Sequence, residues 1–550
     1  MENVNIFALG GQDENGKNCY VLEHNNNIYI INTGVKIPIN SQNGVDTLIP
    51  DFSYLEKNKN KIQGVFISDI KNETFSALPW LVMKIPGLVI YTSAFNKVLI
   101  LERLSKYNIS DANYKVQVIN QPIKLGQLTI KPFALSGSLP GNIGFDFMTK
   151  NGDYLFMFNF VEGNLGIYGK TYFKELRQFL GNNKINALVV DAGKSNFNSK
   201  AINKLNKSAQ IDQAFENADP KAKIVVGAYD EEMVVLEQVL RNAKKYNRPV
   251  AMYGKTYAQL LYLITQVNNK LELPQIIDHK TINKTENVVV LVTGSIERLY
   301  ARFLRITDNK DVYLRLNKAD TVIMLAPPVN GLESLAAVTL DEIAKICSKI
   351  YDIQESEYFR SRPSKHDIYN LVKTLKPKTV IPAQGLYRYL VDASNYLMED
   401  KELKKNMHPI ILQNGKVVHY VDGNLFSLNG KVKEVGDTII DGFGVGDISS
   451  EVIAERDSLG REGVIIINTL YSPKSKKIIS KLHINYVGVI DETDQPEINK
   501  LIKSILIETF NSKQFSSMRE LNEKVRKIIR KKIFKLTDKD PMVALTLTKL

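Results

Sequence analysis

Short hydrophobic runs that predict buried strands recur along the first 200 residues. The runs 4–9, 19–23 and 28–31 are separated by paired glycines and by three consecutive asparagines, which are typical of turns. Two further runs, 64–67 and 88–91, have the continuous apolar pattern of strands buried on both faces. Together these runs predict one half of an α/β sandwich.

From about residue 206 the pattern changes to strands that alternate with longer helices. Strands are predicted at 223–227, 250–253, 288–292 and 321–325, and a helix at 231–246 carries its apolar residues on one side. This alternation is typical of a parallel sheet with helices on its faces.

The last third of the chain mixes both patterns. A strand at 379–382 and a helix at 387–397 lead into a β-rich stretch at 410–435. The glycine-rich segment 441–447 has no apolar period and predicts a linker. The final hundred residues predict a small α/β unit, with strands at 464–467 and 486–489 and helices at 495–510 and 518–534.

Composition places the chain among ordinary folded proteins. It has 550 residues, of which 44% are hydrophobic and 24% charged, enough for about three or four structural units. The two cysteines, Cys19 and Cys347, exclude a disulfide framework or a Cys-rich zinc module, and we expect a cytoplasmic protein. No run approaches the ~18 apolar residues of a membrane helix and no signal peptide is recognisable, so we expect no membrane association.

The net charge is positive, with 72 Lys and Arg against 59 Asp and Glu, or 72 − 59 = +13. This excess favours a polyanionic partner such as RNA. A solvated lysine-rich surface explains the same number, and at this point both interpretations stay open.

Several motifs then point to one known family. In chain order they are GVDTLIPDFSYL at 44–55, KIQGVFI at 61–67, ALP at 77–79, TGS at 293–295, KPK at 376–378 with IP at 381–382, the segment 441–447, and KDPM at 539–542. In order, spacing and total length these motifs resemble bacterial ribonuclease J over almost the whole chain.

The resemblance implies an α/β fold, a metallo-β-lactamase αββα sandwich with an inserted β-CASP α/β domain and a small α/β C-terminal domain. The implied boundaries are 1–205 for the first part of the sandwich, 206–375 for the β-CASP domain, 376–436 for the return segment, 437–450 for a linker and 451–550 for an assembly domain. In this family two zinc ions hold a hydroxide that attacks RNA, at a monophosphorylated 5′ end or internally, and the C-terminal domain supports homo- or hetero-oligomers.

The sequence departs from the family at the metal ligands. Where the family has His-x-His-x-Asp-His, this chain has Asp69, Lys71, Glu73 and Thr74. Three further ligand positions fall on Gly137, on Phe160 (or on Asn159 if the register shifts by one) and on Gln384. The family's His-x-Ser-Gly-His stretch is replaced by residues 358–362, Tyr-Phe-Arg-Ser-Arg.

None of the six histidines of the chain stands at a ligand position. They are His24, His279, His366, His408, His419 and His483, each far from the others in sequence. We therefore expect no zinc site and no cofactor, and we interpret the degenerate positions as non-catalytic.

Two interpretations of the altered pocket stay open. Asp69, Glu73 and Asp191 offer oxygen ligands to one hard cation such as Mg²⁺ or Mn²⁺. Lys71 instead suggests a fixed ammonium that replaces the missing ions, with Phe160 filling the void.

Two basic segments are candidates for RNA contact. The resemblance assigns backbone and phosphate binding to Thr293, Gly294, Ser295, Arg360, Ser361, Arg362 and Lys365. The simpler interpretation is that the basic residues of this set begin a solvated helix. The run 524–534 has apolar residues at helical spacing, so one face packs inward and a basic face is exposed; we expect assembly as its main role, with RNA contact as the weaker hypothesis.

These observations lead to one main hypothesis and two alternatives. The first is a catalytically inactive ribonuclease J-like subunit that binds RNA and pairs with an active ribonuclease J paralogue in mRNA decay and rRNA maturation. The second is an active metal-dependent 5′ exoribonuclease or endoribonuclease with a non-standard site. The third is a stand-alone RNA-binding scaffold.

Overall fold

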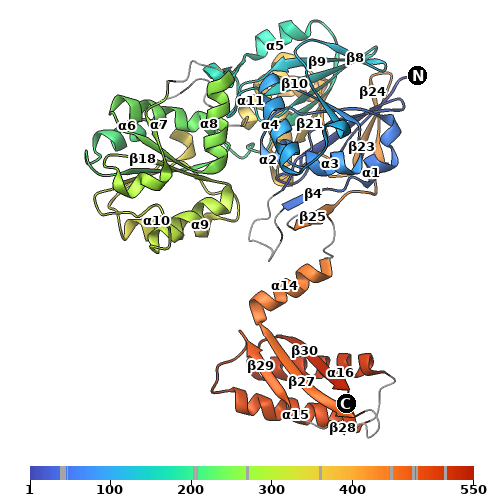
Figure 1. The fold of residues 1–550 in the computed structure, drawn as a ribbon. Coiled ribbons are helices and arrows are strands. Elements are labelled where there is room, and N and C mark those ends of the chain that lie inside the picture. The colour runs from blue at the N-terminus through green and yellow to red at the C-terminus, as the bar shows by residue number, and fades with distance from the viewer. Residues whose placement is uncertain are drawn as a thin grey trace. The chain divides into compact units, whose positions relative to one another are not determined.

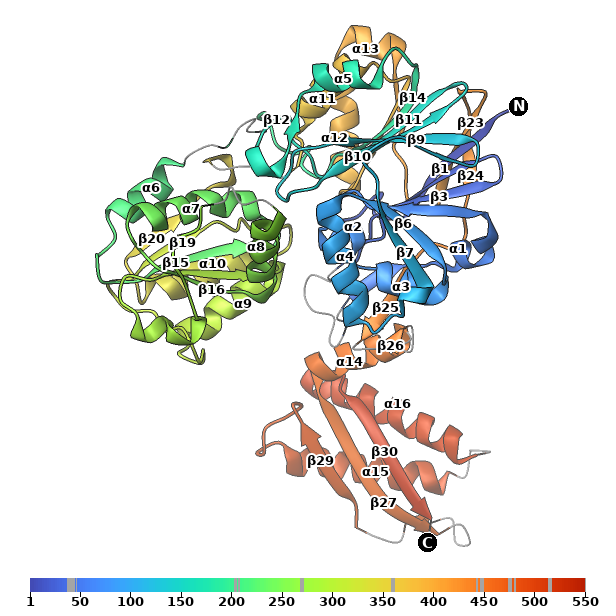
Figure 2. The same cartoon turned by 45° about the horizontal axis from the view of Figure 1, so that its top comes forward.

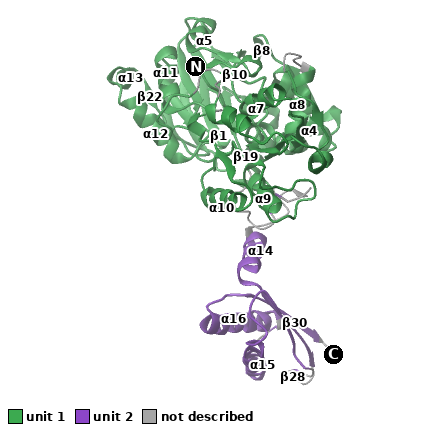
Figure 3. Ribbon diagram, turned by 90° about the vertical axis from the view of Figure 1, so that its left-hand side faces the viewer, with its two compact units in different colours: residues 1–39, 47–438 green, residues 40–46, 439–550 purple. Residues whose placement is uncertain are grey.

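The computed structural model describes residues 1–36, 45, 47–201, 205, 208–267, 272–357, 362–441, 444–445, 450–472, 477–478, 481–512 and 517–549. The chain divides into two compact units, which Figure 3 shows in green and purple. The first unit comprises residues 1–39 and 47–438, and the second comprises residues 40–46 and 439–550.

The first unit contains two large sheets that pack face to face (Figure 1). The eight-stranded sheet has the order β24 (Asn424–Lys431), β23 (Lys416–Val421), β1 (Asn3–Gly10), β2 (Cys19–His24), β3 (Asn27–Ile31), β5 (Ile62–Phe66), β6 (Leu88–Thr92) and β7 (Tyr114–Val118). The seven-stranded sheet has the order β22 (His408–Pro409), β21 (Thr379–Ala383), β14 (Ile185–Asp191), β11 (Gly152–Met157), β10 (Ile143–Thr149), β9 (Leu128–Ala134) and β8 (Ile123–Leu125).

Aromatic side chains join the two sheets. Phe66 of β5 lies with its ring centroid 5.4 Å from that of Phe145 and 5.3 Å from that of Phe147, both on β10. All three residues are fully buried, and burial of such large apolar rings is the main source of stability for a core of this kind.

Helices cover the outer faces of both sheets and complete a four-layered αββα sandwich (Figure 2). Beside the first sheet lie α1 (Ser53–Lys57), α2 (Asn72–Phe75), α3 (Leu78–Lys84) and α4 (Ala94–Lys106). Beside the second lie α5 (Phe173–Leu180), α11 (Lys365–Leu375), α12 (Tyr387–Met398) and α13 (Lys401–Asn406). A capping box between Ser364 and Asp367 fixes the start of α11, so this helix begins directly after the basic stretch that the sequence singles out.

A separate six-stranded sheet is formed by the part of the chain between β14 and β21, so it is an insertion in the sequence of the sandwich. All its strand pairs are parallel, in the order β17 (Ile276–Ile277), β16 (Val250–Tyr253), β18 (Val289–Gly294), β15 (Ile224–Tyr229), β19 (Thr321–Met324) and β20 (Lys349–Asp352). Its helices are α6 (Ala209–Glu216), α7 (Met233–Lys245), α8 (Lys255–Val267), α9 (Ile296–Thr307) and α10 (Glu333–Ala344). The predicted strand 250–253 is confirmed to the residue. Helix α7 starts two residues later than predicted because Glu231 and Glu232 form contacts outside the helix, described below.

The second unit has its helices on one face of a small sheet. Strand β27 (Val464–Ser472) pairs with β28 (Lys477–Ile478), β29 (His483–Val487) and, in parallel, with β30 (Met542–Lys549). Helices α15 (Gln495–Asn511) and α16 (Met518–Thr537) pack on this sheet, and α14 (Ser450–Glu462) precedes it. Strand β27 extends well beyond the predicted run 464–467 because β30 pairs along its length.

The segment 437–450, predicted to be a linker, contains regular structure in its described part. Residues Asp437–Asp441 form strand β25, Gly444–Val445 form β26, and Ile440 is only 2% exposed. Burial of Ile440 favours a strand at this point of the segment. Residues 442–443 and 446–449 lie outside the described residues.

No described helix is long and apolar enough to span a membrane.

Two buried carboxyl groups lie in the second sheet of the sandwich. Asp146 of β10 is fully buried and neither of its oxygens has a hydrogen-bond partner, while Asp153 of β11 accepts one bond from Asn183. Burial, and then the neighbouring Asp153, raises the pKa of Asp146 well above its ordinary value. Burial likewise raises the pKa of Asp153.

We expect the stability of the fold to decrease as the pH rises. A carboxyl group whose pKa is raised in the folded state holds a proton that the unfolded chain has released, so stability is lost above the ordinary aspartate pKa of about 4. Asp146→Asn, which cannot ionise, should raise the free energy of unfolding at pH 8 by about 1–3 kcal/mol and should reduce the difference between pH 5 and pH 8. Denaturant unfolding at the two pH values measures this. Asp308→Asn, at an exposed position, is the control; an unchanged pH dependence in Asp146→Asn would contradict the assignment.

Candidate functional site

The pocket that carries the altered positions lies where strands from both sheets end. Parallel pairing aligns Met157 of β11 with Val190 of β14, and Asp191 of β14 with Ala383 of β21, so the residues that follow these strands meet at one edge. The loop after β5 adds Asp69 from the other sheet. Such carboxyl edges of parallel strands are where α/β proteins bind their ligands.

A buried ion pair between Arg362 and Asp191 occupies this pocket. The side chain of Asp191 is 0% exposed and that of Arg362 is 11% exposed. The guanidinium donates from Nε to Oδ2 over 2.9 Å and from Nη2 to Oδ1 over 2.8 Å, in the bidentate geometry that gives strong, directional pairs. The backbone N–H groups of Gly193 and Asn159 also donate to this carboxylate, over 2.9 and 3.1 Å.

The surroundings of Arg362 are shaped to accept it. Its Nη2 also donates to the carbonyl oxygen of Gln384, and its Nη1 lies 3.9 Å from Oε1 of Glu73. A Cβ atom at position 193 would overlap the guanidinium, so glycine is required there. Burial alone would lower the pKa of Arg362, but the carboxylates of Asp191 and Glu73 raise it further above its ordinary value. Arg362 is therefore a permanent cation.

Two amide side chains link the remaining altered positions. Asn159 donates from Nδ2 to Asp69 over 3.0 Å and to the hydroxyl of Thr74 over 3.3 Å. Gln384 donates from Nε2 to Glu73 over 3.0 Å and to Oδ1 of Asn159 over 3.2 Å. Both amide residues have left-handed backbone conformations, with φ of 51° for Asn159 and 61° for Gln384. Such strain persists only where the surrounding contacts hold it in place.

Both oxygens of Asp69 also accept hydrogen bonds. It accepts bonds from the backbone N–H of Lys71 over 2.9 Å and from the hydroxyl of Ser68 over 3.0 Å, in addition to that from Asn159. Burial raises its pKa above the ordinary value even though these hydrogen bonds and Lys71 act in the opposite direction.

Lys71 reaches away from this network towards the inserted domain. Its Nζ lies 3.1 Å from Oε1 of Glu232, and the backbone N–H of the next residue, Asn72, donates to Glu231 over 2.9 Å. Burial would lower the pKa of Lys71, but Glu232 and other carboxylates raise it. Burial raises the pKa of Glu231 to about 8. These two glutamates are not among the residues predicted from motifs, although adjacent acids directly after a buried strand are a usable signal.

The comparisons with known proteins agree with one another. The family model of the ribonuclease J β-CASP domain matches residues 221–343, and that of the ribonuclease J C-terminal domain matches residues 451–550. Ribonuclease J2 of Bacillus subtilis is 24% identical over 98% of both chains, and ribonuclease J 2 of Streptococcus pyogenes is 24% identical over 99% of both. The chain belongs to the ribonuclease J family.

One further similar protein and one solved structure also match the chain. An uncharacterised protein of Mycoplasma genitalium is 29% identical over the full length of both chains. A solved structure of an Enterococcus faecalis protein of unknown function aligns with a TM-score of 0.52 and 13% identity, over 76% of this chain and all of that one, which bears on the fold alone. The fold is accordingly the metallo-β-lactamase sandwich with an inserted β-CASP domain, as the resemblance predicted.

The residues of this pocket do not fit the two zinc ions that the ribonuclease J family implies. Both oxygens of Asp69 and of Asp191 already accept N–H or O–H donors, and the fixed positive charge of the Arg362 guanidinium, bound to Asp191, repels a metal cation. A Cβ at Gly137 would lie 2.6 Å from the carbonyl oxygen of Asn159, so a histidine cannot be placed there without a backbone shift. Within the described part of the chain, no three His, Cys, Asp or Glu side chains are grouped as metal ligands.

Two predictions about this pocket need correction. Asn159 lies in it, whereas Phe160 packs in the core behind the second sheet, with its ring 6.2 Å from that of Phe173, and does not fill the pocket. The cation beside the former ligand positions is Arg362, because Lys71 extends to Glu232 instead.

The predicted phosphate-binding residues divide into three groups. Arg362 is committed to Asp191, and Lys365 pairs with Asp392 of α12 over 3.2 Å. The side chain of Thr293 is buried, while Gly294 ends β18 and Ser295 precedes α9. Arg360 and Ser361 lie outside the described residues. Of the described members of this set, the structure brings Arg362 alone into the pocket, and as an ion-pair partner.

We expect Arg362→Met to lower the free energy of unfolding by about 3–5 kcal/mol, because it leaves the carboxylate of Asp191 buried without its counter-charge. Asp191→Asn should cost a similar amount, and the double variant should cost clearly less than the sum. Thermal or denaturant unfolding of the three variants measures this. Lys170→Met, which breaks an exposed pair with Glu175, should cost under about 1 kcal/mol. Strictly additive losses would show that the pair is not coupled.

Proposed function

We propose that this chain is a catalytically silent ribonuclease J-like protein that binds RNA and pairs with an active ribonuclease J in mRNA decay and rRNA maturation. The observation that carries the proposal is the bidentate Arg362–Asp191 pair, which lies in the pocket that also contains positions the resemblance equates with metal ligands of the family. Family membership supports RNA processing as the setting, and the net charge of +13 is compatible with an RNA partner.

The chemistry of the pocket supports the absence of hydrolysis. Phosphodiester cleavage needs an activated water and preorganised stabilisation of the negative charge that develops. Asp69 carries a carboxyl group with a raised pKa beside the amide network described above, but three donors already occupy it. The positive charge of Arg362 is neutralised by Asp191 and is not available to a phosphate. The residues thus bind one another instead of a substrate.

The first test is catalytic. The purified full-length chain, incubated with 5′-monophosphorylated RNA and Zn²⁺ or Mn²⁺, should degrade it no faster than the Glu73→Gln variant, and elemental analysis should find less than one zinc per chain. Metal-dependent degradation that Glu73→Gln abolishes would favour the alternative of an active nuclease with oxygen ligands.

The second test concerns the partner. A tagged full-length chain, recovered from its own cells, should co-purify with a ribonuclease J that retains the metal-binding histidines, and nuclease treatment of the lysate should not remove it. A partner that disappears after this treatment is bridged by RNA. Recovery of RNA with no ribonuclease J would instead favour a stand-alone scaffold.

A further inference from the structure

Over half of the net positive charge of the chain is concentrated in one segment. Residues 524–535 contain seven Lys and Arg and no Asp or Glu, so the other residues together carry 13 − 7 = +6. This segment belongs to helix α16 of the second unit. Charge that contributed only to general solubility would be distributed more evenly over the surface.

The apolar face of α16 is already occupied. Leu521, Val525, Ile529 and Ile533 are fully buried in the core that α16 forms with α15 and the sheet. The basic side chains therefore lie on the opposite, exposed face. An amphipathic helix that inserts into a membrane needs a free apolar face, so this arrangement argues against a lipid partner.

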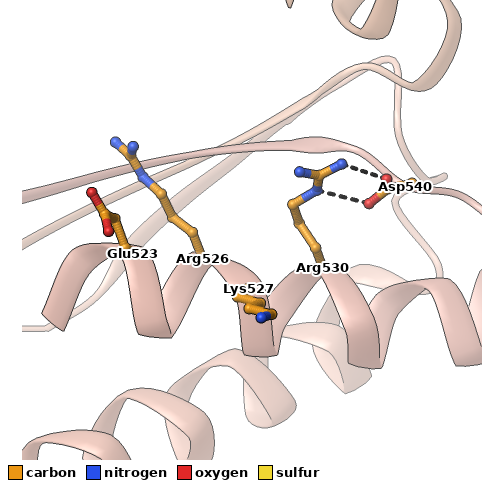
Figure 4. A pocket seen from close by; sticks show the side chains of 5 residues that line it. All are labelled: Glu523, Arg526, Lys527, Arg530 and Asp540. Carbon is orange, nitrogen blue, oxygen red and sulfur yellow. Dashed lines mark hydrogen bonds and ion pairs between the residues drawn. The ribbon is translucent and has the colours of Figure 1, made fainter. Parts of the chain in front are cut away.

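The cations of this face differ in their ion pairing. Arg530 is held by Asp540, with Nε 2.7 Å from Oδ1, and Arg519 lies near Glu523. In the part of the chain that the structure describes, Lys527 and Lys531 form no ion pair. A hollow of about 300 Å³ on this face is lined by Glu523, Arg526, Lys527, Arg530 and Asp540 (Figure 4). Arg526 and Arg530 extend from one side of the helix and Lys527 from another.

An aromatic ring stands among these charges. Phe534 is 50% exposed, and the helical period places it on the same outer face as Lys527 and Lys531. Its ring is outside the apolar core of the unit, so packing does not explain its place. Exposed aromatic rings beside Lys and Arg are the combination that binds single-stranded nucleic acid, through base stacking and phosphate contacts.

We propose that the exposed face of α16 is a binding site for single-stranded RNA, in which Lys527 and Lys531 contact successive phosphates and Phe534 stacks on a base. Lys531 follows Lys527 by about one helical turn, or about 6 Å along the helix axis. The cores of protein–protein interfaces are depleted in lysine, which makes an acidic protein the less suitable partner. This inference rests on the proposed RNA-binding function and assigns that function to helix α16.

The test uses the full-length chain and a fluorescent oligo(U) RNA of about 12 nucleotides, within the usual site size for single strands. Lys527→Gln/Lys531→Gln should weaken binding and should reduce the slope of log affinity against log salt by about 1.4, because each of the two phosphate contacts contributes ~0.7 to that slope. Lys500→Gln/Lys503→Gln removes the same charge from α15 and should leave the slope nearly unchanged. An equal effect of both pairs would mean that only net charge matters and would overturn the site.

A second pair of variants tests the aromatic ring. Phe534→Ala should weaken oligo(U) binding about five-fold or more, whereas Leu536→Ala, at a neighbouring position that is 59% exposed, should not. Light scattering must show an unaltered oligomeric state; a loss of RNA binding that follows a change in assembly would assign α16 to self-association. Unaltered affinity in all variants refutes this inference alone, while a chain that binds no RNA at all refutes the RNA-binding part of the proposed function as well.

Discussion

The buried pair of Arg362 and Asp191 determines the character of the whole pocket. Removing a guanidinium and a carboxylate from water is costly, and only a close, bidentate, fully hydrogen-bonded arrangement offsets that cost. The backbone N–H groups of Gly193 and Asn159 and the carbonyl of Gln384 supply further partners. The lack of a side chain at Gly193 leaves room for the guanidinium. The pocket is thus built around a cation that belongs to the chain itself.

Local sequence patterns predict most of the architecture, because each strand and helix carries its own hydrophobic period. Strand 250–253 and the parallel sheet around it follow from such runs. Strand β30 does not, since it is specified by pairing with β27, which lies far earlier in the chain. The segment Asp437–Asp441 resembles a linker in sequence because its glycine-rich continuation outweighs two adjacent isoleucines.

The sequence predicts that the pocket lacks metal-binding histidines, but it does not predict which side chains occupy the pocket. That residues other than histidine, such as Lys71 and Gly137, stand where the resemblance expects histidines follows from motif spacing alone. Arg362 could not be assigned to Asp191, because 171 residues separate them and an arginine in a basic stretch is compatible with a solvated surface. The roles of Glu231 and Glu232 are also not predictable from local sequence, because their partners in the loop after β5 are distant in sequence and lie in another domain.

The close packing around Gly137 has an evolutionary consequence. A histidine at this position meets the carbonyl of Asn159, and one at Gln384 loses the bonds to Glu73 and Asn159 while Arg362 remains in place. Either substitution alone is therefore expected to give a less stable protein, and neither by itself assembles a set of metal ligands. A metal site in this pocket requires several coordinated substitutions, including one that removes the arginine, so single substitutions are an unfavourable evolutionary route to it.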